Sequence, residues 1–170
     1  YISRSRPDIK FILILLATKM EEPNVADMKQ LERVIGYLKK TENLVLTIKP
    51  MHMRLQASAD ASYAIHHDAK SHTGVVMTLG TSPVKSNSIK QKLVVKSSTE
   101  AELVALNSVV EDVIWAKGIM EELGYPQPTV NIFQDNKSCI TMANRGTANS
   151  KRSKHINVRY FFWNCKFQKK

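Results

Sequence analysis

Lys-Ser-Ser-Thr-Glu-Ala-Glu-Leu-Val-Ala-Leu, residues 96–106, has the composition of a helix start. Ser97 or Ser98 can cap the first turn, because a serine side chain accepts hydrogen bonds from unpaired backbone N–H groups. Apolar residues then recur at helical spacing until Gly124, a typical stop signal. We therefore expect a long helix ending near Leu123. Two pairs have the spacing of a capping box: Ser97 with Glu100, and Thr99 with Glu102.

Strands are predicted on both sides of this helix. Apolar and polar residues alternate from Met51 to Ala57 and lead directly to Asp60. Residues 74–80 and 84–95 predict two more strands, and residues 129–133 predict a fourth. Three consecutive strands favour an antiparallel meander. The helix then crosses over to a fourth strand, which we expect beside the first and parallel to it, reached by a right-handed connection.

Residues 1–48 predict a helical hairpin that precedes this α/β domain, which would span residues 49–170. Pro7 and Asp8 mark a helix start. The apolar run from Phe11 to Ala17 is too short to cross a bilayer, and we expect it to form a buried helix. A second helix should end near Lys40.

Asp60, Glu100 and Asp135 each lie where a predicted strand ends or a helix begins. If the first and fourth strands are neighbours, Asp60 lies beside Asp135, and Glu100 can face the same point. Clustered carboxylates repel one another unless cations neutralise them. Oxygen ligands favour Mg²⁺ or Mn²⁺, and a pair of such ions can hold a phosphodiester for hydrolysis. Glu102 is expected to point elsewhere, as a cap or a surface acid.

The histidines and cysteines can also bind metals, but here they are predicted to be solvated imidazoles and free thiols. His66, His67 and His72 lie in or beside a polar stretch, where solvated histidines are more common than metal ligands. Cys139 and Cys165 have no CxxC spacing, which favours free thiols in a reducing, intracellular setting.

The formal net charge of +10 is concentrated near the end of the chain. Residues 136–170 contain nine Lys or Arg and no acid, whereas residues 1–135 contain sixteen bases and fifteen acids. Nucleic-acid binding is the favoured interpretation, and a solvated basic tail is the alternative. Helical spacing from Ile156 to Phe167 also predicts an amphipathic helix. The candidate phosphate contacts are Lys137, Lys151, Arg152, Lys154, His155 and Arg159.

Several blocks in order resemble the ribonuclease H domain of copia-type LTR retrotransposon polyproteins. The central block is residues 97–102, preceded by Asp60-Ala61-Ser62 and followed by Asp135-Asn136. Residues 70–74, 90–92 and 154–162 also fit, and residues 6–9 and 34–41 resemble the connection segment after the reverse transcriptase. The resemblance covers essentially the whole chain.

The resemblance implies a ribonuclease H-like fold and hydrolysis of the RNA strand of RNA–DNA hybrids during reverse transcription. The matching acids are Asp60, Glu100 and Asp135, which would hold two Mg²⁺ or Mn²⁺ ions. The implied partners are the hybrid and the reverse transcriptase portion of the same polyprotein. No membrane association is expected. The implied location is cytoplasmic, within a virus-like particle.

One departure from the family keeps other functions open. Family members have a fourth acid, an Asp beyond the helix that starts near Lys154, but this chain has no acid after Asp135. We therefore expect the last strand and helix of the family to be absent. A decayed or domesticated module that binds nucleic acid or a protein without turnover is the alternative. An integrase or transposase core ranks lower, because its glutamate comes last and Glu100 is in the middle.

Overall fold

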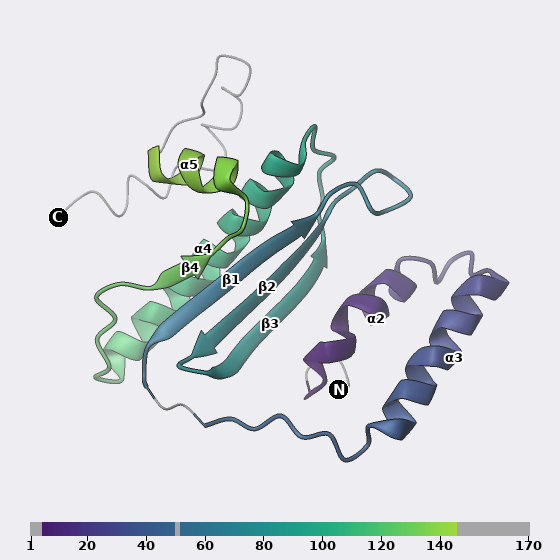
Figure 1. Cartoon of the computed structure of the whole chain (residues 1–170), viewed down its shortest axis with the longest axis horizontal. Helices are drawn as coiled ribbons and strands as arrows, with labels where there is room; N and C mark the ends of the chain where they lie inside the picture. The colour runs from purple at the N-terminus through teal and green to yellow at the C-terminus, as the bar shows by residue number, and fades with distance from the viewer. Residues whose placement is uncertain (1–4, 50–51, 146–170) are drawn as a thin grey trace.

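The computed structural model describes residues 5–49 and 52–145 of the chain. It has an α/β fold built on a mixed four-stranded sheet with the order β3-β2-β1-β4 (Figure 1). The strands are β1 (Leu55–Ser62), β2 (His72–Leu79), β3 (Ser82–Lys90) and β4 (Asn131–Phe133). The helices are η1 (Pro7–Ile9), α2 (Lys10–Ala17), α3 (Val25–Lys40), α4 (Ser98–Glu122) and α5 (Lys137–Arg145).

The sheet has the predicted connectivity. β1 pairs antiparallel with β2, and β2 pairs antiparallel with β3. After α4 crosses over, β4 pairs parallel with β1, from Gln56↔Asn131 to Ser58↔Phe133. The predicted fold class is confirmed, since this arrangement is compatible with a ribonuclease H-like fold. Some predicted boundaries were wrong: β3 ends at Lys90 and not near residue 95, and β1 continues to Ser62. Asp60 therefore lies within β1 and not after its end.

The main core lies between α4 and one face of the sheet. Leu55, Ala57 and Ala59 alternate along β1 and are buried. They pack with Val75 and Met77 of β2, as the period of two in a strand requires. α4 lies behind the sheet in Figure 1 and contributes a buried stripe to the same cluster. That stripe includes Leu103, Leu106, Val109, Val110, Val113 and Met120.

The predicted helical hairpin is present, but its first helix is not buried. α2 contacts β3, and the Lys10 ammonium donates to the backbone carbonyl of Ser86. α3 begins with a capping box between Asn24 and Asp27. α2 is almost entirely apolar, yet none of its residues is buried, because the sheet and α3 cover only part of its surface. Our expectation of a buried helix from Phe11 to Ala17 was therefore wrong.

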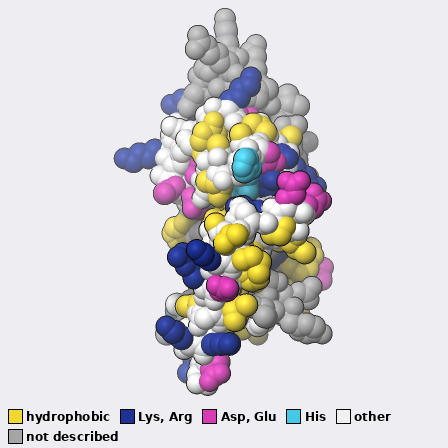
Figure 2. Space-filling view, turned by 90° about the vertical axis from the view of Figure 1, so that its right-hand side faces the viewer, with side chains coloured by type: hydrophobic (Ala, Val, Ile, Leu, Met, Phe, Trp, Pro, Cys, Tyr) yellow, Lys and Arg dark blue, Asp and Glu magenta, His cyan; other side chains and the backbone are white. Residues whose placement is uncertain are grey.

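Hydrophobic side chains are also exposed on α3. Figure 2 views the molecule from the side where α3 lies in Figure 1 and shows hydrophobic side chains interspersed with charged ones. On α3 the exposed large hydrophobic residues are Val25, Met28, Leu31, Ile35 and Tyr37.

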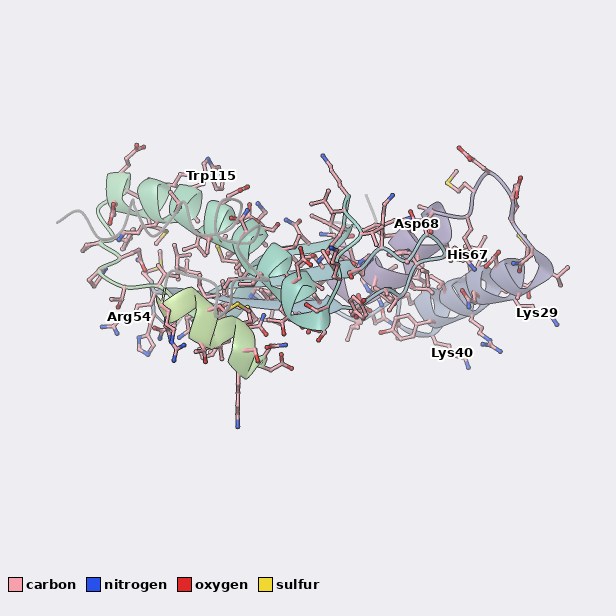
Figure 3. All side chains as sticks on the ribbon, turned by 90° about the horizontal axis from the view of Figure 1, so that it is seen from above. Lys29, Lys40, Arg54, His67, Asp68 and Trp115 are labelled. Carbon is pink, nitrogen blue, oxygen red and sulfur yellow. The ribbon has the colours of Figure 1, made fainter. Side chains whose placement is uncertain are left out.

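Two histidines form a buried pair that the sequence did not predict. His66, in the β1–β2 loop, places Nε2 3.0 Å from Nδ1 of His72, and Nε2 of His72 is 2.7 Å from the Ser88 hydroxyl. Phe11 of α2 packs edge-on against the His72 ring. The expectation that these histidines are solvated was therefore wrong for His66 and His72. His67 is exposed, and it lies with Asp68 on the side of the molecule near α2 (Figure 3).

Within residues 5–49 and 52–145, no helix has the length and apolar character needed to cross a bilayer. The amphipathic helix predicted from Ile156 to Phe167 lies outside the described residues. So does the region in which the last family strand and helix were expected to be absent.

The packing of α4 predicts that Leu103→Ala destabilises the fold. Leu103 is 2% exposed, and truncation of a buried leucine leaves a cavity. We expect the free energy of unfolding to fall by about 2–5 kcal/mol in urea titrations. Leu44→Ala is the matched control, because Leu44 is 55% exposed. It should change stability by less than about 0.5 kcal/mol. Equal losses in both variants would contradict the assigned core.

The histidine pair predicts a loss of stability in weak acid. Burial lowers the pKa of both His66 and His72 from 6.5; Lys90 and Lys70 lower that of His66 further, and Asp68 opposes them. The unfolded chain therefore binds protons at higher pH than the folded chain, and the free energy of unfolding falls as pH drops below about 6.5. Urea titrations from pH 8 to pH 5 measure this slope. It should become shallower in His72→Gln, and an unchanged slope would refute the assignment.

Candidate metal centre

Three carboxylates from three different elements converge at one edge of the sheet. Asp60 of β1, Glu102 of α4 and Asp135 after β4 each offer one oxygen, and these oxygens lie within 4.8 Å of one another. Asp60 and Asp135 are exposed, whereas Glu102 is only 6% exposed. The cluster is therefore open to solvent on one side and enclosed by protein on the other.

The parallel pairing of β1 and β4 brings the two aspartates together. The last paired residues are Ser58 and Phe133. Both strands point the same way, so Asp60 and Asp135 each follow two residues after this last pair. The structure thus brings Asp60 and Asp135 together as the sequence predicted.

Glu102, and not Glu100, completes the cluster. The two glutamates are two residues apart on α4, which separates their directions by about 200° around the helix axis. Glu100 turns back to the helix start, where its Oε2 accepts a hydrogen bond from the backbone N–H of Lys96 at 2.9 Å. The Ser97 side chain accepts from the backbone N–H of Glu100 at 3.2 Å. Glu100 therefore helps to cap α4. The structure places Glu102, and not the predicted Glu100, beside the two aspartates.

The surroundings of Glu102 oppose its ionisation. Burial raises the pKa of its carboxyl group, and the negative charges of Asp60 and Asp135 raise it further. Hydrogen bonds from the Gln134 side chain and from the backbone of Ala61 act in the opposite direction. A cation among the three acids would remove their mutual repulsion.

The donor set fits a hard divalent cation. All three side chains present carboxylate oxygens, which suit Mg²⁺, Mn²⁺ or Ca²⁺ better than Zn²⁺. The exposure of the two aspartates leaves room for water or substrate oxygens to complete the coordination. Burial and the nearby Glu102 raise the pKa of the Cys139 thiol to about 12.

One of the predicted nucleic-acid contacts can be placed. Lys137 is exposed at the start of α5, two residues after Asp135. Lys151, Arg152, Lys154, His155 and Arg159 lie outside the described residues, and so does Cys165.

Comparison with known proteins identifies relatives among transposon polyproteins. The chain is 32% identical over 166 residues, 95% of its length, to the retrovirus-related Pol polyprotein from transposon RE1 of Arabidopsis thaliana. It is 30% identical over 157 residues, 92% of its length, to the corresponding polyprotein from transposon TNT 1-94 of Nicotiana tabacum. A third relative, the putative transposon Ty5-1 protein YCL074W of Saccharomyces cerevisiae, is 32% identical over 64% of the chain and 36% of its own length.

The match is to one segment of much longer proteins. The chain spans 11% of the RE1 polyprotein and 12% of the TNT 1-94 polyprotein. No protein-family model matches the chain. The similarity therefore supports the assignment of this chain to a region of a retrotransposon Pol polyprotein.

Because Glu102 lies beside the two aspartates and Glu100 caps α4, variants of the two glutamates form a matched pair. Glu102→Gln should weaken Mn²⁺ binding, measured by isothermal titration calorimetry, at least about 10-fold, because it removes a charged ligand. Glu100→Gln should retain both the Mn²⁺ affinity and the fold, because the amide oxygen of glutamine can accept the same backbone N–H bond at the helix start. If Glu100→Gln weakens Mn²⁺ binding and Glu102→Gln does not, Glu100 is the ligand and this assignment is wrong.

Proposed function

We propose that this chain is the ribonuclease H region of a retrotransposon Pol polyprotein, a divalent-metal-dependent endonuclease acting on the RNA strand of RNA–DNA hybrids. The convergence of Asp60, Glu102 and Asp135 carries this proposal. Similarity to Pol polyproteins along most of the chain and the mixed α/β fold support it. Glu102 replaces Glu100 in the proposed catalytic set, for the geometric reason given above.

Each acid has a distinct position in the proposed reaction. Two bound Mg²⁺ or Mn²⁺ ions would generate the attacking hydroxide and stabilise the leaving 3′ oxygen. Asp60 would be the shared ligand of the two ions, with Glu102 and Asp135 as the candidate ligands on either side. Glu102 is held by protein contacts, whereas the two aspartates face the solvent from which a phosphodiester would approach.

Asp60 lines a cleft that includes groups able to hydrogen-bond a sugar–phosphate backbone. It lies between β1, β2 and β3 and the start of the helical hairpin, and it is lined partly by hydroxyl groups. Hydroxyl groups and lysine ammonium groups hydrogen-bond phosphate and ribose oxygens without reading sequence. The lining residues that can make such bonds are Lys10, Ser58, Ser62, Ser86 and Ser88.

The proposed partners and domain boundaries follow from the same proposal. The RNA–DNA hybrid is the proposed substrate, with Lys137 and the basic residues beyond position 145 as phosphate contacts. Residues 1–48 are the proposed connection to the reverse transcriptase portion of the polyprotein, and residues 49–170 the proposed nuclease domain. A virus-like particle in the cytoplasm is the proposed location.

The excess of basic residues in residues 136–170 supports a second candidate function. A module that retains the fold and the basic charge would bind nucleic acid without cleaving it. The three clustered acids favour the nuclease, since a binding module gains nothing from carboxylates facing a polyanion.

A cleavage assay separates the two functions. Labelled RNA–DNA hybrid, duplex RNA and duplex DNA are incubated with the protein, with and without Mg²⁺. We expect Mg²⁺-dependent cleavage of the hybrid alone, reduced about 10³-fold in Asp60→Asn because a charged ligand of the reacting centre is lost. Asp68→Asn is the control, since Asp68 pairs with Lys70 and Lys90 away from the cluster. It should cleave at the parental rate. Salt-sensitive binding without cleavage by the parent protein would select the binding module.

A further inference from the structure

Gln134 links the metal-ligand candidate Glu102 to the backbone of the sheet. Its Nε2 donates to Oε2 of Glu102 at 3.0 Å and to the carbonyl oxygen of Ala59 at 3.2 Å. Its Oε1 accepts from the backbone N–H of Asn136 at 3.0 Å. One half-buried amide therefore contacts α4, β1 and the residues that lead into α5.

These contacts fix the three partners of Gln134 relative to one another. Ala59 immediately precedes Asp60, and Asn136 immediately follows Asp135. Asn136 is itself held in place, because its Oδ1 accepts from the backbone N–H of Cys139 at 3.0 Å. The glutamine thus ties Glu102 to backbone groups adjacent to both aspartates.

Such a restraint favours the Glu102 side chain as a metal ligand. It has several rotatable bonds, and ordering it costs conformational entropy. An amide donor on one carboxylate oxygen removes part of that freedom before an ion arrives. Two carboxylate oxygens have about four acceptor positions in total, so the bond to Gln134 leaves capacity for a cation.

We propose that Gln134 is a positioning residue that holds the Glu102 carboxylate in its ligand position. The inference rests on the proposed function, because it assigns Gln134 a role toward the ion that the three acids would bind. Outer partners of metal ligands generally contribute 10–100-fold to metal affinity. Gln134 contacts no reacting atom and is not a catalytic residue.

The test separates positioning of the ligand from support of the fold. Gln134→Met keeps the length of the side chain and removes the amide nitrogen and the amide oxygen. We expect its Mn²⁺ dissociation constant to rise about 10-fold in calorimetric titrations. In a Glu102→Ala background the same substitution should leave the residual Mn²⁺ affinity unchanged, because the carboxylate that it positions is absent.

Gln127 provides a matched control for loss of stability. Its side chain also ties β1 to the approach to β4, since Oε1 accepts from the Leu55 N–H and Nε2 donates to the Met53 carbonyl. It does not contact the three acids. Gln127→Met should therefore lower the melting temperature of the metal-free protein and leave the Mn²⁺ dissociation constant unchanged.

The outcomes are distinct. If Gln134→Met binds Mn²⁺ as the parent does while Glu102→Gln does not, the positioning role is refuted and the metal centre stands. An equal effect of Gln134→Met with and without Glu102 also refutes the positioning role. If the parent protein itself fails to bind Mn²⁺, the proposed function fails first.

Discussion

The parallel pairing of β4 with β1 is the contact on which the proposed site depends. It involves only three residue pairs, from Gln56↔Asn131 to Ser58↔Phe133. So short a ladder needs support, and a glutamine side chain supplies it at each end. Gln127 binds the backbone before and at the start of β1, and Gln134 binds the Ala59 carbonyl beyond the last pair. The two aspartates lie two residues beyond the last pair of this ladder, at the end that Gln134 supports.

The sequence predicted the sheet and two of the three acids, because those predictions depend on long-range rules with few exceptions. Alternation identified β1, and short apolar runs identified β2 and β4. The crossover through a helix predicted that the fourth strand runs parallel to the first. The choice between Glu100 and Glu102 depended instead on which residue caps the helix. With Ser97 as the cap, Glu100 lies at the position from which a side chain reaches back to the helix start. The sequence allowed both caps, and only the geometry of the first turn distinguishes them.

The histidines and α2 show where residue composition was misleading. A polar loop predicted solvated imidazoles, yet the short β1–β2 connection folds His66 back onto His72, and each ring satisfies part of the other's hydrogen bonding. An apolar run predicted a buried helix, yet α2 packs against β3 and against α3 without any of its residues becoming buried. Burial depends on which elements pack together, which local composition does not specify.

The spacing of the two glutamine side chains restricts how the chain can vary in length. Gln127 and Gln134 are separated by six residues, and their partners on β1, Leu55 and Ala59, lie on one continuous strand. A residue inserted between the two glutamines would shift one amide away from its partner and move Asp135 along the sheet edge. An insertion in the β1–β2 loop would alter neither contact. Tolerance to insertions should therefore differ sharply between the segment from Gln127 to Gln134 and the β1–β2 loop.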